Sequence, residues 1–265
     1  MTLKIIVSGP RGRMGKAAVN MILNEEDMEL VACIDRINNG KMLADIDGMP
    51  DANVPIFVDP KQCFESIQAD IFLELSIPDV AFLHTVHALQ SGLRAVVGTS
   101  GLTKEQIHDL RLLALEKELG CIIAPNFAIG AVLMMQFAKK AARYFPDVEI
   151  IEKHHDHKLD APSGTAVKTL DMILEARIDK QQGHPNEKET WPGARGANQS
   201  GVHIHSVRLP GLIAHQEVIF GGLGQTLTIT HDSYNRQSFM TGVKFALTKV
   251  TELTELVYGM ENIID

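Results

Sequence analysis

A glycine-rich turn that joins a short apolar run to a helical pattern constrains the fold of this chain more than any other feature. The glycines are Gly9, Gly12 and Gly15; the apolar run covers residues 3–7, and apolar side chains recur at helical spacing over residues 14–22. In this context glycine lets the backbone turn tightly and approach a pyrophosphate at the positive end of the helix. The sequence therefore predicts that the chain opens with a dinucleotide-binding unit.

A second β-like run, residues 29–34, ends in two charged residues, Asp35 and Arg36. Asp35 lies twenty positions beyond the last glycine, where dinucleotide-binding domains place an acid that accepts hydrogen bonds from the adenosine ribose. Arg36, with Arg11 or Arg13 nearby, could instead pair with the 2′-phosphate of NADPH. Because these two side chains favour different cofactors, we expect both NADH and NADPH to be used.

Through the first half of the chain, β-like runs alternate with helical patterns. Strands are expected at 56–58, 70–75, 94–97 and 121–124, and helices at 79–89 and 103–119. In the second of these helices Thr103 is the expected N-cap, and Gln106 completes a capping box. The alternation predicts an α/β fold with a Rossmann-like, doubly wound parallel sheet.

Ligands of such sheets bind outside the carboxyl ends of the strands, where this chain has turn residues in segments 76–78, 98–101 and 124–127. Each segment alone could be a plain turn. Together with the glycine turn and the end of the second strand, they define the expected cofactor site. The residues that we expect to contact NADH or NADPH are Gly9, Pro10, Arg11, Gly12, Arg13, Met14, Asp35, Arg36, Gly98, Thr99, Ser100, Ala124, Pro125, Asn126 and Phe127.

After Asn126 the pattern changes, which indicates a second domain. Helices are expected at 131–143 and 163–177, strands at 148–153, 203–208, 214–220 and 226–231, and a long loop at 179–201. A last helix, 238–256, is expected to pack back onto the first domain. We therefore expect a dinucleotide-binding domain of residues 1–126, completed by 236–265. Residues 127–235 should form an α+β domain with a mixed or antiparallel sheet for substrate binding and oligomerisation.

The composition is typical of a globular cytoplasmic protein. Of 265 residues, 45% are hydrophobic and 22% are charged, and no run approaches the roughly 20 apolar residues of a membrane span. The N-terminus enters a strand directly, which argues against a signal peptide. The three cysteines form no C-x-x-C pair, and Cys33 and Cys121 fall in strands expected to be buried, as in a reducing compartment. The net charge of −8 disfavours nucleic acid as a partner.

Residues 152–166 hold the densest group of reactive side chains, with three histidines and two lysines ahead of a Ser-Gly-Thr turn. His154 can donate a proton near neutral pH, and Lys158 can stabilise developing negative charge. Gly164 would begin a helix whose free backbone N–H groups hold a carboxylate, while Ser163 is either an N-cap or a ligand contact. A polar loop of solvated histidines is the plainer interpretation, but the combination suits a small polycarboxylate that undergoes protonation.

Four motifs carry a resemblance to a known family: Gly9-x-x-Gly12-Arg13-Met14-Gly15, Gly98-Thr99-Ser100-Gly101, Asn126-Phe127 and Glu152-x-His154-His155-x-His157-Lys158-x-Asp160-Ala161-Pro162-Ser163-Gly164-Thr165-Ala166. In order and spacing, over essentially the whole chain, they resemble the 4-hydroxy-tetrahydrodipicolinate reductase family, also called dihydrodipicolinate reductase. The resemblance implies reduction of the dihydrodipicolinate synthase product to tetrahydrodipicolinate with NADH or NADPH, in the diaminopimelate route to lysine. It also implies a homotetramer assembled through the sheets of the second domain.

The resemblance also implies roles for individual residues. His154 would be the proton donor and acceptor, Lys158 a second donor, and His155, Gly164 and Thr165 would bind the substrate. Hydride delivered to C4 of a conjugated cyclic imine leaves an enamine-like carbanion equivalent that must be protonated. Protein acids are therefore needed, and a covalent nucleophile is not.

Two positions depart from the family: Asp35 stands where Glu is frequent and Asp156 where a basic residue is common, which leaves the cofactor preference open. A metal hydrolase using His154, His155 and His157 is a rival interpretation. However, adjacent histidines on an extended segment point apart, and we expect no metal. A cofactor-sensing regulator and a dehydrogenase of sugars or semialdehydes are two further rival functions. His157 receives no role within the cluster, and we expect His203, His205 and Arg236 to be structural rather than catalytic.

Overall fold

The apolar run after the N-terminus forms the middle of a seven-stranded parallel sheet in the computed structural model, which describes residues 2–264. The strands are β1 (Leu3–Ser8), β2 (Met28–Ile34), β3 (Ile56–Phe57), β4 (Ile71–Glu74), β5 (Arg94–Val97), β6 (Cys121–Ile123) and β12 (Leu256–Tyr258). Their order is β12-β6-β5-β4-β1-β2-β3, and every neighbouring pair is parallel. The carboxyl ends of β1, β2 and β4 therefore meet at one edge of the sheet.

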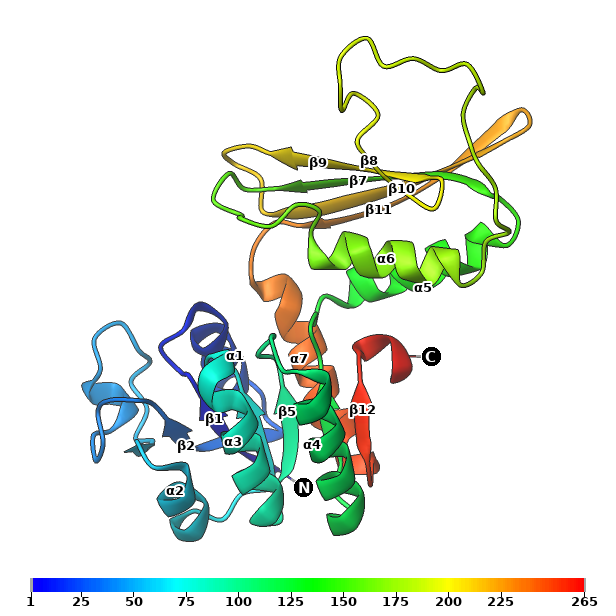
Figure 1. Cartoon of the computed structure of the whole chain (residues 1–265). Coiled ribbons are helices and arrows are strands. Elements are labelled where there is room, and N and C mark those ends of the chain that lie inside the picture. Colours follow the sequence, from blue (N-terminus) through cyan, green and yellow to red (C-terminus); the bar gives the residue numbers. More distant parts are fainter. Residues whose placement is uncertain (1, 265) are drawn as a thin grey trace. The chain divides into compact units, whose positions relative to one another are not determined.

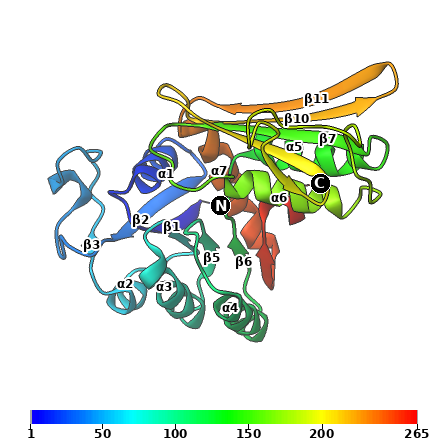
Figure 2. The same ribbon diagram turned by 45° about the horizontal axis from the view of Figure 1, so that its top comes forward.

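Helices cover both faces of this sheet. They are α1 (Arg13–Leu23), α2 (Pro60–Ser66), α3 (Pro78–Gln90), α4 (Lys104–Lys117) and α7 (Gln237–Lys249), with short 3₁₀ turns at Leu43–Asp45, Val250–Glu252 and Met260–Asn262. Figures 1 and 2 show α2, α3 and α4 in a row on one face and α1 and α7 on the other. Thr103 and Gln106 exchange the two hydrogen bonds of a capping box at the start of α4, as expected. The predicted doubly wound, Rossmann-like sheet is confirmed.

The chain divides into two compact units. Unit 1 consists of Met1–Phe127 and Phe239–Asp265, and unit 2 of Ala128–Ser238. In unit 1, the apolar side chains of β1, β4 and β5 are buried beneath the helices. The three cysteines are buried there as free thiols, and burial raises the pKa of each to about 12. They are core residues that stay protonated at neutral pH.

Two elements of unit 1 differ from the prediction. The helix expected at 238–256 ends at Lys249, and the chain then forms β12, whose buried Leu256 pairs with Cys121 of β6. A strand here satisfies backbone groups at the edge of the sheet, and this outweighs the helical spacing of the apolar residues. The prediction also omits α2, although Asp59 caps this helix and Pro60 occupies its first position.

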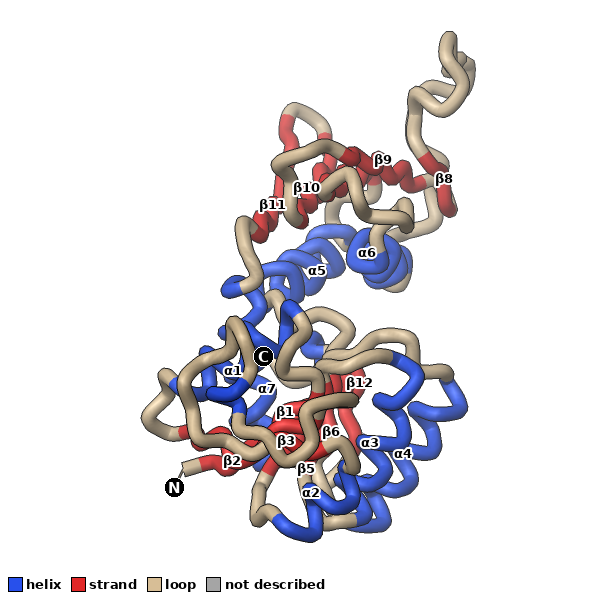
Figure 3. The backbone as a smooth tube through the Cα atoms, turned by 90° about the vertical axis from the view of Figure 1, so that its left-hand side faces the viewer, coloured by secondary structure: helices blue, strands red, loops and turns tan. Residues whose placement is uncertain are grey.

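Unit 2 packs two helices against a five-stranded mixed sheet. The strands are β7 (Asp147–His154), β8 (Ala197–Gln199), β9 (Val202–Arg208), β10 (Ala214–Gly222) and β11 (Gln225–Ser233), and the helices are α5 (Ile129–Ala142) and α6 (Gly164–Leu174). The order is β11-β10-β7-β9-β8; β7 and β9 are parallel, and the other pairs are antiparallel. Figure 3 shows α5 and α6 on the same face of this sheet. The expected α+β architecture with a mixed sheet is confirmed.

The segment that follows α6 is more ordered than the sequence suggests. The helix expected to reach residue 177 ends at Leu174, and the buried Arg177 then donates hydrogen bonds to three backbone carbonyl oxygens. The acceptors are Pro146 at 2.5 Å, Lys180 at 2.5 Å and Ser200 at 2.9 Å. These bonds tie both ends of residues 178–201 to the start of β7. Within the segment, where the sequence predicts a long loop, β8 pairs with β9.

Candidate active site

A cavity of about 590 Å³ lies at the carboxyl edge of the unit 1 sheet. Its lining includes five of the residues expected to contact the cofactor: Gly9, Arg11, Gly12, Asp35 and Arg36. The loop after β4 and the first turns of α3 complete the wall. The remaining lining residues are Ser8, Ile34, Val58, Leu75, Ser76, Ile77, Val80 and His84.

The backbone of the glycine turn requires glycine at two positions. Gly9 has a φ of +77°, and a Cβ atom there would lie 2.8 Å from the carbonyl oxygen of Leu75. A Cβ atom on Gly15 would lie 2.0 Å from the carbonyl oxygen of Gly9, so only glycine lets α1 start this close to β1. The turn thus leaves its backbone open beside the cavity, which fits the pyrophosphate of a dinucleotide.

Asp35 is held by Arg11 at the end of β2. The Arg11 guanidinium binds both carboxylate oxygens of Asp35, with Nη2 at 2.9 Å from Oδ1, and Asn38 donates a third hydrogen bond. Burial would raise the pKa of Asp35, but the bonds and charge of Arg11 outweigh it and hold the pKa below its usual value. A ribose bound here would therefore share the Asp35 carboxylate with Arg11. Arg36 also lines the cavity, and it is exposed to solvent.

The other residues expected at the cofactor site lie outside this cavity lining. A Cβ atom on Gly98 would lie 2.5 Å from the ring of Phe127, so the two expected segments after β5 and β6 touch each other. Thr99 is buried, and its hydroxyl lies 3.5 Å from Glu74. The residues of the turn and of α1 that do not line the cavity are Pro10, Arg13 and Met14; Ser100, Ala124, Pro125 and Asn126 lie at the ends of β5 and β6.

In unit 2, the histidine-rich stretch connects the end of β7 to the start of α6. Ser163 is the N-cap, since its hydroxyl accepts a hydrogen bond from Ala166 N at 3.2 Å. Gly164 is the first helical residue; it is exposed, and a Cβ atom there would meet nothing within 4 Å. Neither packing nor backbone conformation requires glycine at this position. Its N–H group therefore stands at an uncrowded helix start, where a carboxylate can approach.

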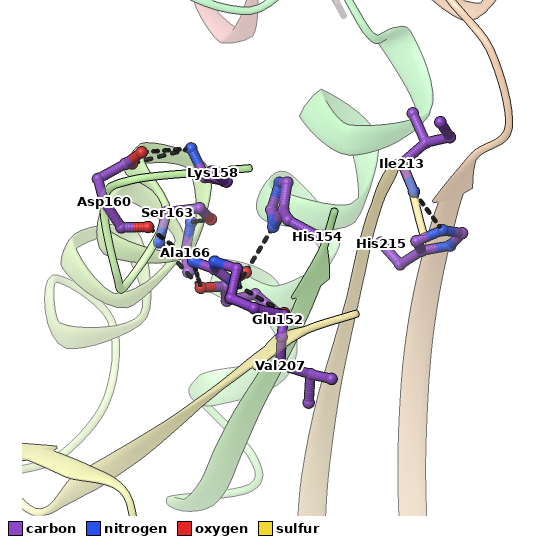
Figure 4. Close-up of polar contacts among 10 residues, drawn as sticks. Glu152, His154, Lys158, Asp160, Ser163, Ala166, Val207, Ile213 and His215 are labelled. Atoms are coloured by element: carbon purple, nitrogen blue, oxygen red, sulfur yellow. Dashed lines mark hydrogen bonds and ion pairs between the residues drawn. The ribbon is translucent and has the colours of Figure 1, made fainter. Parts of the chain in front are cut away.

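Glu152 connects the elements of this site (Figure 4). It is fully buried on β7, and its two oxygens accept bonds from Arg208 at 2.7 and 2.8 Å, from Ser163 N at 3.2 Å and from His154 Nδ1 at 2.5 Å. Burial would raise the pKa of Glu152, but the bonds from Arg208, Ser206 and His154 hold it below its usual value. The result is an ionised carboxylate that fixes the helix start and the histidine in one arrangement.

The bond to Glu152 defines the state of His154. Because a carboxylate only accepts, Nδ1 must carry a hydrogen, which leaves Nε2 for a ligand. Burial lowers the pKa of His154; Glu152 opposes this, and the charges of Lys158 and Arg208 add to it, so the pKa lies below its usual value. Such an imidazole gives up its proton readily.

Two other expected residues lie in the loop between β7 and α6. Lys158 Nζ is 2.7 and 2.9 Å from the carboxylate oxygens of Asp160, whose carbonyl oxygen accepts a bond from Arg208 at 2.7 Å. His155 Nδ1 is buried without a hydrogen-bond partner among residues 2–264. An unsatisfied nitrogen at this point is what a substrate-binding histidine would present.

The remaining histidines have other environments. His157 is 90% exposed, and within the described part of the chain no three His, Cys, Asp or Glu residues are arranged to hold a metal ion. His203 binds the carbonyl of Arg195 at 2.6 Å, and His205 binds Glu149 at 2.8 Å, so both support the sheet. Arg236 is exposed.

Sequence reasoning missed the roles of Glu152 and Arg208. Glu152 could have been found, because residues two apart on a strand share a face, and Glu152 stands two before His154. Arg208 lies 56 residues from Glu152 in the sequence, and no local sequence pattern predicts that these two side chains pair.

Comparison with known proteins adds independent findings. The family model described as "Dihydrodipicolinate reductase, N-terminus" matches residues 3–127, and "Dihydrodipicolinate reductase, C-terminus" matches residues 130–264. Curated proteins named 4-hydroxy-tetrahydrodipicolinate reductase are 58% identical in Geobacillus kaustophilus and 57% in Oceanobacillus iheyensis, over 100% of both chains. A solved dipicolinate-bound dihydrodipicolinate reductase from Paenisporosarcina sp. TG-14 is 56% identical, with a TM-score of 0.92 over 100% of both chains.

Proposed function

The chain belongs to the dihydrodipicolinate reductase family, and on that premise we propose how its residues reduce 4-hydroxy-tetrahydrodipicolinate to tetrahydrodipicolinate. The enzyme is an NAD(P)H-dependent oxidoreductase of lysine and diaminopimelate biosynthesis. The assignment of roles depends on Glu152, which accepts from His154 Nδ1 and from the backbone N–H of Ser163 and so holds the histidine beside the start of α6. Loss of NADH or NADPH absorbance on addition of freshly made dihydrodipicolinate synthase product tests the activity.

The glycine turn, Asp35 and Arg36 would hold the cofactor, because the turn leaves its backbone open to a pyrophosphate and the two side chains line the same cavity. Bound NADH or NADPH supplies the hydride. The chain itself orients the adenosine ribose through Asp35, which Arg11 keeps ionised.

The substrate is a dicarboxylate that would bind at the start of α6. Gly164 N–H and Thr165 would hold one carboxylate, and His155 would donate to the substrate from its unsatisfied ring. Lys158 would leave Asp160 to stabilise the negative charge that develops. His154, positioned by Glu152, would deliver the proton from Nε2 to the carbanion equivalent.

Replacing Gly164 with Pro is expected to weaken binding of dipicolinate, a planar dicarboxylate, without unfolding the protein. Gly164 is the first residue of α6, where proline is tolerated, and the extended Ser163 before it has a ψ of 152° that suits a following proline. The change removes one N–H donor to a carboxylate, which corresponds to about 1.5–3 kcal/mol. Calorimetric titration of dipicolinate measures the loss.

Gly164→Ala is the control for this substitution, because it adds a Cβ atom in open space and keeps the N–H group. Thr165→Val, which removes a hydroxyl, should weaken dipicolinate binding as well. If Gly164→Pro and Thr165→Val both bind dipicolinate as tightly as wild type, the helix start is not the anion site.

Cofactor preference should respond in opposite directions to two substitutions. Arg36→Ala should penalise NADPH selectively, by roughly 1.5–3 kcal/mol for a lost charge-assisted hydrogen bond, and Asp35→Ala should penalise NADH. The measurement is the ratio of kcat/KM for the two cofactors in wild type and each variant. A ratio that moves by less than a few-fold in both variants would mean that β2 does not end at the ribose.

We further propose a cytoplasmic homotetramer that binds no nucleic acid. In unit 2, α5 and α6 cover one face of the sheet, and the other face carries paired charges such as Lys153–Glu217 and His215–Asp232. The edge strand β11 is largely exposed, and the unpaired backbone groups of such an edge can pair with another chain. Light scattering, which gives the mass in solution, tests this assembly.

A further inference from the structure

A buried acid lies beside the cofactor cavity and has no role in the reaction proposed above. Glu74 ends β4 and is fully buried, next to Ser8 at the end of β1. Its oxygens accept bonds from Ser76 N at 2.6 Å and from Thr99 Oγ1 at 3.5 Å, and Oε2 lies 3.1 Å from His84 Nδ1. A buried carboxylate needs several donors, and these three supply them.

The imidazole of His84 is held between this acid and the first strand. Ser8 Oγ lies 3.4 Å from the same Nδ1 atom that contacts Glu74, and the ring centroids of His84 and Phe72 are 6.5 Å apart in an edge-to-face arrangement. Glu74 and Ser8 both contact the ring at Nδ1, so Nε2 is the nitrogen left for a ligand. Only 15% of the side chain is exposed, so the ring has little freedom to turn away.

His84 presents its ring to the cofactor cavity. It lies on the same face of α3 as Val80, one turn earlier, and both residues line the cavity together with Gly9 and Gly12 of the glycine turn. Ser76 Oγ, in the same wall, is buried with no hydrogen-bond partner among residues 2–264. This wall thus offers polar groups to a ligand, and the turn beside them is the one that approaches a pyrophosphate.

We propose that His84, oriented by Glu74, donates a hydrogen bond from Nε2 to a phosphate oxygen of the dinucleotide cofactor. Glu74 is a positioning residue in this arrangement, because its carboxylate accepts from Nδ1 and fixes the orientation of the ring. A phosphate requires the doubly protonated imidazolium, because Nε2 of the neutral ring would be an acceptor. The other charged groups that line the cavity are Arg11, Asp35 and Arg36, of which Arg11 is paired with Asp35.

The inference rests on the proposed cofactor site and is tested by fluorescence titration of NADH with the full-length protein at pH 6. His84→Gln should weaken NADH binding by about 10-fold or more. Glu74→Gln, which keeps the imidazole and changes only the group that orients it, should weaken NADH binding less. His87→Gln, which removes an imidazole from the same helix outside the cavity lining, should match wild type.

Dipicolinate affinity, which reports on unit 2, should be unchanged in all three variants. NADH affinity within twofold of wild type in His84→Gln would overturn the contact. If His84→Gln does not fold, NMR of the wild-type protein provides the test. Addition of NADH should shift the imidazole resonance of His84 and leave that of His87 unchanged. An unshifted His84 resonance contradicts the proposal. Failure of the wild type to bind NADH would instead refute the proposed function.

Discussion

Turnover should fall by about 10² to 10⁴ when His154 is replaced by Ala, because the reaction then lacks its proposed general acid. Lys158→Ala should lower kcat strongly as well, through loss of the positive charge that we propose for stabilising the developing anion. Asp160, the partner of Lys158, is 60% exposed and will be solvated, so that variant should fold normally. The measurement is kcat at saturating substrate and cofactor, together with the dissociation constant of NADH.

The NADH dissociation constant should stay within about twofold of wild type in both variants, since His154 and Lys158 belong to unit 2 and the proposed cofactor site to unit 1. His157→Ala is the matched control, because this imidazole lies in the same loop but is 90% exposed. It should turn over like wild type. Near-normal kcat in both His154→Ala and Lys158→Ala would show that the proton comes from elsewhere.

The parts of the fold that the sequence predicts best are those where one physical requirement dominates locally. At Gly9 and Gly15 any Cβ atom would clash with backbone, so the glycine spacing is readable without the structure. The capping box of Thr103 and Gln106 and the N-cap at Ser163 are also local bonds between residues three apart. Such features can be identified before the three-dimensional arrangement is known.

The features that escape prediction depend on partners distant in the chain. Leu256 follows a helical pattern but forms β12, because an open edge of β6 is available beside it. Arg208 is an ordinary strand residue until folding brings it to the carboxylate of Glu152. Arg11 shows the same effect: the sequence offers it, as an alternative to Arg13, for helping Arg36 to bind the phosphate of NADPH, whereas the fold pairs it with Asp35. Motifs thus indicate candidate site residues, and tertiary pairing determines their electrostatic state.

Glu152→Gln tests whether the charge of Glu152 controls the pKa of His154. His154 must be protonated to act as the acid, so kcat should fall as pH rises through the pKa of His154. Because the negative charge of Glu152 raises that pKa, removing the charge should lower it further and move the falling limb of the pH profile to lower pH. The expected result is a lower kcat at neutral pH and partial recovery in more acidic buffer, measured as kcat against pH.

The same substitution should destabilise the protein, because Arg208 loses its partner carboxylate. Breaking a buried ion pair commonly lowers the free energy of unfolding by about 3–5 kcal/mol. Because the Arg208 side chain is 19% exposed, we expect a loss at the lower end of this range. The pKa of Glu152 is held low in the fold, so its contribution to stability is present above the unfolded-state pKa and disappears as pH falls through the folded-state value. The deficit in urea unfolding should therefore be largest near neutral pH and shrink in acid.

Glu149→Gln is the matched control for Glu152→Gln: it removes a carboxylate from the same strand that also binds an arginine and a histidine, Arg195 and His205. Glu149 is 30% exposed, so its loss should cost about 1 kcal/mol, and it does not touch His154. Its pH profile should overlay that of wild type. If the two variants shift the profile equally, or if Glu152→Gln leaves it in place, Glu152 acts only as a structural anchor and His154 is not the acid that it controls.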